Sequence, residues 1–184
     1  MERHDAVEHG SEIDWERVYT GTTADYEPPN SVILAEVERL PPGRALDVGC
    51  GAGGLVAALV ERGWHVTGID VASTAVAAAR PVLAQRGLQA PLPAADATTW
   101  RSPDRFDLVT NSFALPTSAA ERARVFASMR AALAPRGTLL IEEHDTVMSR
   151  QGMLAGYDLV SVAELREAFA DFDIGSAKTR IYEI

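Results

Sequence analysis

The chain has 184 residues and a formal net charge of −9; 47% of its residues are hydrophobic and 23% are charged. This length predicts one domain with a full hydrophobic core, and the net charge argues against a nucleic-acid partner, because phosphate binding needs a basic face. No apolar run approaches the roughly 20 residues that span a bilayer, and the N-terminus lacks the regions of a signal peptide, so we expect a cytoplasmic protein without membrane contact. The single cysteine, Cys50, excludes an internal disulfide and a multi-cysteine metal site, and we expect no metal.

The first 30 residues form an acidic leader. They hold eight Asp and Glu residues against two arginines, which leaves a net charge of −6 out of the total of −9. We therefore expect two parts, an acidic leader over residues 1–30 and a single folded domain over residues 31–184.

Segments with strand and helix periodicity alternate along the rest of the chain. Strands are predicted at 45–48, 64–69, 88–93, 105–110 and 138–142, and helices at 32–40, 55–62, 73–87, 119–133 and 161–170. Residues 173–184 are mostly β-prone and are expected to add a last strand. This alternation predicts an α/β fold, a doubly wound and mostly parallel sheet with helices on both faces.

Local signals refine three of these elements. Pro81 lies inside a predicted helix, where it removes a backbone hydrogen bond at a cost of about 3 kcal/mol, so we expect a kink or a break near Arg80. Prolines also make residues 88–93 a poor strand, which only the edge of a sheet would tolerate. Ser161 and Glu164 form a capping box that begins the last helix.

A glycine-rich turn follows the first predicted strand and opens a helix. Gly49, Gly51 and Gly53 let the backbone take positive φ angles and let a ligand approach more closely than a Cβ atom would permit. The helix start offers free N–H groups to a polar ligand. The same segment also satisfies G-x-G-x-x-G with Gly54, the dinucleotide fingerprint of dehydrogenases, so the turn alone does not select the nucleotide.

Polar residues come directly after three predicted strands. Asp70, Asp96 and Asn111 should converge on one crevice, because the carboxyl ends of parallel strands meet at one edge of the sheet. Asp70 follows Gly49 by 21 residues, the spacing at which an acid accepts hydrogen bonds from ribose hydroxyls. Asp96 is either an acceptor for an exocyclic amine such as adenine N6 or an acid that caps its own turn.

Taken together, these motifs resemble those of the class I S-adenosylmethionine-dependent methyltransferases. The resemblance rests on five segments in the family's order, at 45–53, 66–70, 95–97, 106–109 and 133–140. The leader from Asp14 to Tyr19, with Pro29 and Asn30 ahead of the first helix, is similar to small bacterial members of the tellurite- and thiopurine-type groups.

The resemblance implies S-adenosylmethionine as the cofactor. It places Asp47 and the glycine turn around the methionine part, Asp70 at the ribose and Asp96 with Ala97 at the adenine. Asp47 could equally be a structural acid that bonds the amides of the turn. The full predicted cofactor-binding set is Asp47, Gly49, Gly51, Gly53, Asp70, Val71, Asp96, Ala97 and Asn111.

The expected reaction is methyl transfer to a small-molecule N, O or S nucleophile. This reaction is an in-line displacement from a sulfonium, so the protein mainly aligns the nucleophile and excludes water. His144 is the candidate general base, with a surface residue beside acids as the alternative. Trp15, Tyr19 and Tyr26 are predicted to form a lid with aromatic faces toward the sulfonium, unless they belong to an ordinary amphipathic helix.

Two other functions stay open at this point. A nicotinamide-dependent oxidoreductase would share the glycine turn and the ribose acid, but it gives no role to Asp47 or to residues 95–97. A non-catalytic methyltransferase-like binding or regulatory domain stays open because the acceptor loop at 111–116 is poorly specified and the sheet is expected to be incomplete. The loop also lacks the Asn-Pro-Pro-aromatic motif of enzymes that methylate amino groups of nucleic acids and proteins, which argues against that subclass. Only residues 174–184 remain for the C-terminal hairpin of the family, so we expect it to be incomplete. The sequence does not specify the acceptor or the oligomeric state.

Overall fold

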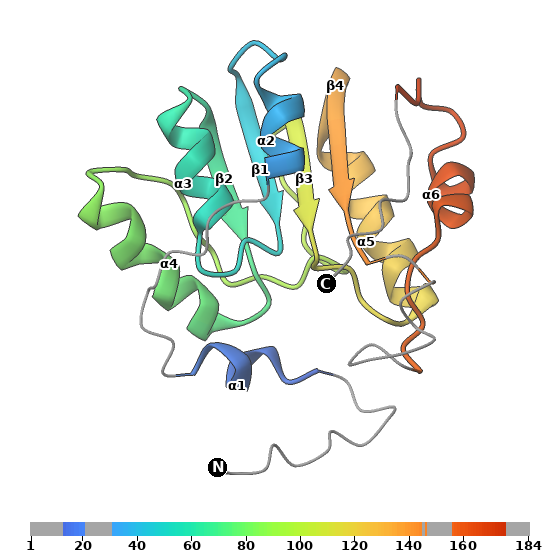
Figure 1. Cartoon of the computed structure of the whole chain (residues 1–184), viewed down its shortest axis with the longest axis horizontal. Helices are drawn as coiled ribbons and strands as arrows, with labels where there is room; N and C mark the ends of the chain where they lie inside the picture. The colour runs from blue at the N-terminus through green and yellow to red at the C-terminus, as the bar shows by residue number, and fades with distance from the viewer. Residues whose placement is uncertain (1–12, 21–30, 145, 147–155, 176–184) are drawn as a thin grey trace.

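A four-stranded parallel sheet forms the centre of the protein in this computed structural model, which describes residues 13–20, 31–144, 146 and 156–175. The strands are β1 (Arg44–Val48), β2 (His65–Ile69), β3 (Phe106–Ser112) and β4 (Leu133–Glu142), and they lie in the order β2-β1-β3-β4 (Figure 1). All neighbouring pairs are parallel. From β1 the chain continues to β2 at one edge of the sheet. It then crosses over to β3, which lies on the other side of β1, so the direction in which strands are added reverses between β1 and β3. In a doubly wound sheet this switch point is where a ligand binds.

Helices cover both faces of the sheet. One hydrophobic cluster joins the sheet to α2 (Ser31–Val37), α3 (Gly54–Glu61) and α4 (Ser73–Gln85). A second cluster on the opposite face joins it to α5 (Ala119–Ala132) and α6 (Val162–Ala168). The remaining short helix, α1 (Trp15–Tyr19), lies below the carboxyl ends of the strands beside α4 (Figure 1). Within the described ranges, no helix combines the length and apolar character that crossing a bilayer requires.

This arrangement confirms the predicted fold, but Pro81 does not break its helix. Helix α4 runs continuously from Ser73 to Gln85 with the proline inside it. Pro81 is exposed, and so is Ala77, whose carbonyl loses its helical donor and is left to solvent. On the other side of the helix, Val76 and Val82 are buried in the core. This burial offsets the cost of the proline. The predicted break is therefore wrong, and the alternative, a kink near Arg80, stays a prediction.

The predicted strand at 88–93 is also wrong, because this segment only lies alongside β2. The carbonyl of Pro91 accepts from the Gly68 N–H at 3.0 Å. Asp70 and Ala94 then form an isolated parallel bridge. A regular ladder does not form because Pro91 and Pro93 have no N–H to donate. The segment therefore borders the sheet without joining it.

The ends of the fold differ from expectation in two further ways. Strand β4 begins at Leu133, directly after α5, and its pairing with β3 shifts register between Leu133 and Thr138. Arg136 turns the chain within this irregular stretch with a φ of 66°. The last strand predicted at 173–184 falls largely outside the described residues, since the structure describes the chain only to residue 175 and residues 173–175 are not a strand.

Candidate functional site

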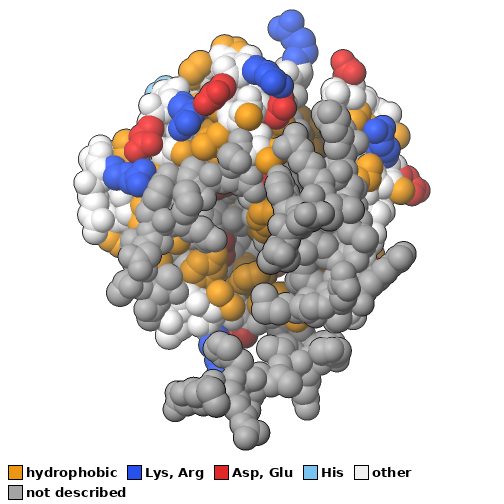
Figure 2. All heavy atoms as spheres, viewed as in Figure 1, with side chains coloured by type: hydrophobic (Ala, Val, Ile, Leu, Met, Phe, Trp, Pro, Cys, Tyr) orange, Lys and Arg blue, Asp and Glu red, His pale blue; other side chains and the backbone are white. Residues whose placement is uncertain are grey.

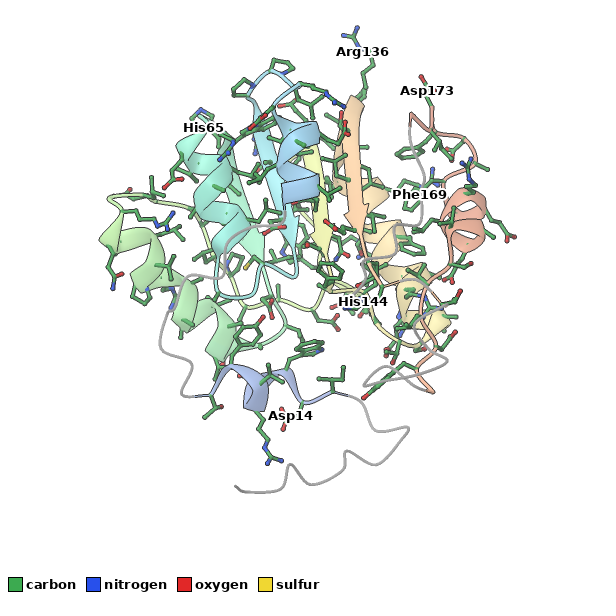
Figure 3. The ribbon with its side chains drawn as sticks, in the orientation of Figure 1. Asp14, His65, Arg136, His144, Phe169 and Asp173 are labelled. Atoms are coloured by element: carbon green, nitrogen blue, oxygen red, sulfur yellow. The ribbon has the colours of Figure 1, made fainter. Side chains whose placement is uncertain are left out.

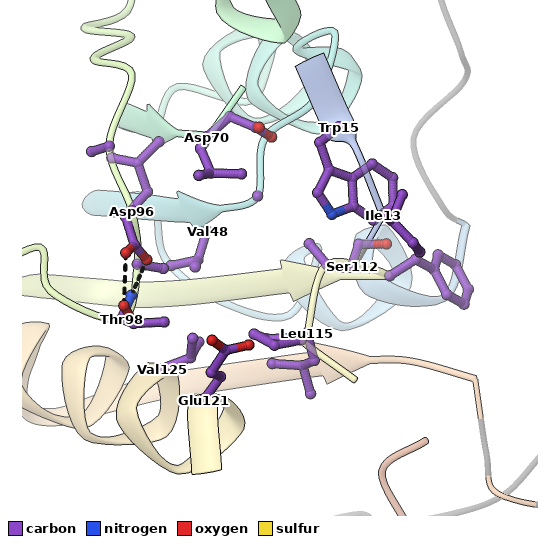
Figure 4. Close-up of a pocket in the computed structure, with 18 of the residues that line it drawn as sticks. Ile13, Trp15, Val48, Asp70, Asp96, Thr98, Ser112, Leu115, Glu121 and Val125 are labelled. Carbon is purple, nitrogen blue, oxygen red and sulfur yellow. Dashed lines mark hydrogen bonds between the residues drawn. The ribbon is translucent and has the colours of Figure 1, made fainter. Parts of the chain in front are cut away.

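One pocket of about 250 Å³ opens at the carboxyl edge of the sheet (Figure 4). It brings together the glycine turn after β1, the acid after β2, the segment at 95–98, the loop after β3 and the start of α5. Ile13, Trp15 and Tyr19 of the leader also line it. The lining residues are Ile13, Trp15, Tyr19, Val48, Gly49, Ile69, Asp70, Val71, Ala95, Asp96, Ala97, Thr98, Ser112, Phe113, Ala114, Leu115, Pro116, Thr117, Glu121 and Val125.

Close packing explains why positions 49 and 51 of the turn are glycines. Gly49 has a φ of +77°, and a Cβ atom there would lie 2.1 Å from the Cβ of Ala114. Gly51 has a φ of +50°, and a Cβ atom there would lie 2.6 Å from the hydroxyl of Tyr19. L-residues rarely adopt such φ values, so both conformation and space require glycine. The turn therefore contacts the loop after β3 on one side and the leader on the other.

Asp70 links the end of β2 to the glycine turn. Its two carboxylate oxygens accept from the Gly51 N–H at 2.8 Å and from the Ala72 N–H at 2.9 Å. Burial raises the pKa of this carboxyl above its ordinary value, although the two backbone N–H groups oppose the change. A carboxylate has about four acceptor positions, so two stay available for hydroxyl groups of a ligand. Asp70 both shapes the turn and lines the pocket.

The predicted adenine-side residues lie in the same pocket. Asp96 is exposed and holds its own turn, accepting from the Thr98 N–H and from the Thr98 hydroxyl, both at 2.8 Å (Figure 4). Ala97 lines the pocket, and so does Val71, which is 57% exposed. Asp96 therefore caps its own turn and also lines the pocket. Its contact with an adenine stays a prediction.

Four residues of the predicted set are not among the pocket-lining residues: Asp47, Gly51, Gly53 and Asn111. Gly53 packs against α4, where a Cβ atom on it would lie 2.9 Å from the Cβ of Ala79. Asp47 and Asn111 are buried. Asp47 accepts from the Thr110 hydroxyl at 2.8 Å. Burial raises its pKa to about 7, and the nearby Asp70 carboxylate adds to this effect. Asn111 belongs to β3, not to the loop after it, and donates from Nδ2 to the Val48 carbonyl at 2.9 Å. Its Oδ1 is buried without a hydrogen-bond partner among the described residues.

Cys50 lies within this buried layer, where only 6% of it is exposed. Burial raises the pKa of its thiol, and the carboxylates of Asp47 and Asp70 raise it further. The thiol is therefore held in its neutral, unreactive form, as expected for a small side chain that packs beneath the turn.

The loop after β3 is held by Glu143, a glutamate that is not among the predicted site residues. The Glu143 carboxylate accepts from the Leu115 N–H at 2.8 Å and from the His144 N–H at 3.2 Å. Burial raises the pKa of Glu143 to about 7. Its position directly after a predicted strand was the available signal, but the contact with Leu115 spans 28 residues.

His144 itself is not among the pocket-lining residues. Its ring packs on Phe113, which does line the pocket, with 4.6 Å between the ring centroids. Burial lowers the pKa of His144. It lies at the carboxyl edge of the sheet, whereas His65 lies at the opposite edge (Figure 3). A role for His144 as general base stays a prediction.

A buried arginine holds the other end of the same loop. Arg122 is 1% exposed and binds both carboxylate oxygens of Glu164, at 2.8 and 3.1 Å. Its Nη1 also donates to the carbonyls of Pro116 and Thr117. The hydroxyl of Ser161 caps α6 as predicted, but the Glu164 carboxylate that would complete the capping box is used by Arg122.

The two raised carboxyl pKa values predict that stability falls as the pH rises. Folded Asp47 and Glu143 hold their protons up to about pH 7, whereas the unfolded groups release them near pH 4. Their stabilising contribution is therefore complete below about pH 4 and is lost as the pH rises through about 7. The measurement is the free energy of unfolding in urea at several pH values between about pH 5 and about pH 8. Asp47→Asn should make this free energy fall less steeply with pH than in wild type, and the exposed control Glu61→Gln should show the wild-type slope. Equal slopes in all three proteins would contradict the assignment.

Part of the predicted lid also lies at the pocket. Trp15 and Tyr19 line it, and Ile13 and Trp15 lie across it from Glu121 and Val125 (Figure 4). Tyr26, the third predicted lid residue, lies outside the described residues.

The glycine turn, the acid after β2 and the pocket at the switch point define a nucleotide-binding α/β domain. Residues 45–137 match the sequence profile of the methyltransferase domain family, and the chain belongs to this family. The ribosomal RNA small subunit methyltransferase C of Alcanivorax borkumensis is 33% identical over 144 residues, which cover 76% of this chain and 40% of that protein. The chain thus spans less than half the length of that relative.

Two solved structures extend the comparison. The first comes from work on the conversion of a disulfide bond into a thioacetal group during echinomycin biosynthesis. It has a TM-score of 0.70 and 25% sequence identity, and the match covers 85% of this chain and 76% of that one. The other is the glycopeptide N-methyltransferase MtfA complexed with S-adenosyl-L-methionine, with a TM-score of 0.55, 26% identity and coverage of 65% of this chain and 56% of that one. These matches confirm the resemblance to class I S-adenosylmethionine-dependent methyltransferases. The closer likeness to the tellurite- and thiopurine-type groups stays a prediction.

Proposed function

We propose that the domain binds S-adenosylmethionine in this pocket and transfers its methyl group to a small neutral or cationic nucleophile. The observation that carries the proposal is the convergence of the glycine turn, Asp70 and residues 95–98 on one pocket in a chain of the methyltransferase domain family. We assign the folded methyltransferase domain to residues 31–184 and a covering role to the leader at 1–30.

The residues present fit this cofactor. Gly49 lines the pocket with backbone that carries no side chain, so a ligand can approach the turn closely there. Asp70 keeps free acceptor positions for ribose hydroxyls. Val71 and Leu115 supply apolar surface for a base within the same pocket. The donor supplies an activated methyl group on a sulfonium, so the protein needs no strong activating group of its own.

The charge of the pocket supports a neutral or cationic acceptor. Asp70, Asp96 and Glu121 line it, and its described lining contains no Lys, Arg or His. The Glu121 carboxylate points into the pocket (Figure 4), and the Arg124 guanidinium lies 3.5 Å from it. An anionic acceptor would meet repulsion here, whereas an amine or a neutral hydroxyl or thiol would not.

The reaction needs only one bond to form and one to break. The acceptor's lone pair forms a bond to the methyl carbon while the carbon–sulfur bond breaks, and its electron pair stays on sulfur as a neutral thioether. A proton carried by a neutral acceptor leaves to solvent or to a base. A cationic ammonium acceptor has to lose its proton before the bond forms, because its nitrogen has no lone pair until then. The pocket residues align the acceptor and exclude water from the reacting atoms.

An RNA acceptor is the main alternative, because one relative is named as a ribosomal RNA methyltransferase. Phosphate backbones require a basic surface, but the chain carries −9. On the described part of the face in Figure 2, basic and acidic side chains alternate along the upper edge and form no continuous basic patch. We therefore favour the small acceptor.

Calorimetry and a labelled-methyl screen test the proposal. We expect binding of S-adenosylmethionine and of its demethylated product, and no binding of nicotinamide dinucleotides; the reverse pattern would indicate an oxidoreductase. The screen should transfer label to amines, thiols or phenols in preference to carboxylates. Label found only in RNA would replace the small acceptor with a nucleic acid, and donor binding without any transfer would indicate a non-catalytic domain.

A further inference from the structure

Among the described residues of the leader, Glu16 makes a cluster of hydrogen bonds to the folded domain. Its carboxylate accepts from the backbone N–H groups of Ser73 and Thr74, at 2.8 and 3.1 Å, and from the Thr74 hydroxyl at 2.8 Å. The Thr74 hydroxyl also lies 3.0 Å from the Glu16 carbonyl oxygen. These contacts join positions 57 and 58 residues apart in the chain.

The partner of Glu16 is the first turn of α4, which has no cap of its own. Ala72 stands at the N-cap position and offers no side-chain acceptor. The first N–H groups of a helix have no partner within the helix, and the helix dipole favours a negative charge at this end. Glu16 supplies both the acceptor and the charge. These hydrogen bonds lower the pKa of Glu16 to about 2, so the carboxylate stays ionised at neutral pH.

This attachment point lies next to the proposed donor site. Helix α4 begins three residues after Asp70, at Ser73. From the same short helix α1, Trp15 lines the pocket and the Tyr19 hydroxyl packs against Gly51. Because α1 has only five residues, its attachment at Glu16 constrains the positions of both aromatic side chains.

We propose that Glu16 is a positioning residue that docks α1 on the N-terminus of α4 and thereby holds Trp15 and Tyr19 over bound S-adenosylmethionine. The role rests on the proposed function. It explains how an exposed, acidic segment is kept at one place on the domain surface.

The test compares Glu16→Gln, Thr74→Val and the double variant, with Glu36→Gln on α2 as the matched control. We expect Glu16→Gln to release radiolabelled S-adenosylmethionine about tenfold faster than wild type, because a charge-assisted interaction is weakened. The midpoint of thermal unfolding should fall by no more than about 4 °C, since Glu16 also stabilises the first turn of α4. Thr74→Val should show a smaller acceleration, and the double variant should release the donor no faster than Glu16→Gln. Glu36→Gln should match wild type. An unchanged release rate in Glu16→Gln would overturn the proposal.

A second measurement separates this proposal from the proposed function. Hydrogen exchange of the Ser73 and Thr74 amides in the ligand-free protein should accelerate in Glu16→Gln and stay slow in Glu36→Gln, whether or not a donor binds. Slow exchange in Glu16→Gln would overturn the docking. A wild-type protein with protected amides that binds no S-adenosylmethionine would overturn the proposed function and the donor-holding role, and leave docking as a property of the fold.

Discussion

Asp70→Ala should weaken S-adenosylmethionine binding at least 100-fold. The variant removes the acceptor for ribose hydroxyls, and a hydrogen bond to a charged group contributes about 1.5–3 kcal/mol, so two such bonds correspond to a factor of about 100 or more in affinity. It also removes the partner of the Gly51 and Ala72 N–H groups. Leaving buried donors unpaired costs about 1–3 kcal/mol, so the free energy of unfolding should fall as well.

Asp107→Ala is the matched control for this prediction. Asp107 also accepts a backbone N–H, from Arg44 at 2.9 Å, but at the opposite end of the sheet. Its variant should lose some stability and keep full donor affinity. Calorimetric titration and urea unfolding of both variants separate binding from folding. If Asp70→Ala bound the donor as wild type does, Asp70 would be only a structural acid of the turn.

Arg122→Met should produce the largest loss of stability, about 3 kcal/mol. Removing one member of a buried ion pair leaves an uncompensated charge and costs about 3–5 kcal/mol. We expect the lower end because the Glu164 side chain is 32% exposed. The carbonyls of Pro116 and Thr117 lose a donor at the same time, so the loop after β3 should become more mobile.

Arg124→Met provides the comparison on the same helix. The Arg124 side chain is 52% exposed and its ion pair with Glu121 spans 3.5 Å. Exposed pairs contribute about 0–1 kcal/mol, so this variant should unfold close to wild type. Similar losses in the two variants would mean that the Arg122 contacts add little. Hydrogen exchange of residues 112–117 gives an independent measure, and faster exchange should occur in Arg122→Met alone.

The sequence predicted the parts of the fold that local patterns determine. The glycine turn, Asp70 and the strands around them follow from periodicity, φ requirements and a fixed spacing, and the structure brings them to one pocket. Asp47 was expected among the cofactor contacts; it is buried and accepts from Thr110, so its contact with a cofactor stays a prediction. The effect of Pro81 on its helix was overestimated. The free-energy cost of a proline depends on whether the carbonyl that loses its donor, here that of Ala77, can bind water, and a sequence does not show this.

The contacts that complete the site are long-range and could not be predicted in this way. Glu16 joins α4 across 57 residues, and Arg122 joins Glu164 across 42. Each looked like an ordinary charged residue on a solvated helix face. Their partners are known only once the chain has folded, because acids and arginines are common and nothing in the local pattern selects one pair.

The burial of Cys50 makes the chain convenient for site-specific labelling. It is the only cysteine, and its buried, neutral thiol should resist maleimide reagents in the folded protein. A cysteine introduced at Val18, which is 53% exposed on α1, would then be the single reactive position. A fluorophore attached there would report the movement of α1 against the sheet in real time, with no native cysteine to remove first.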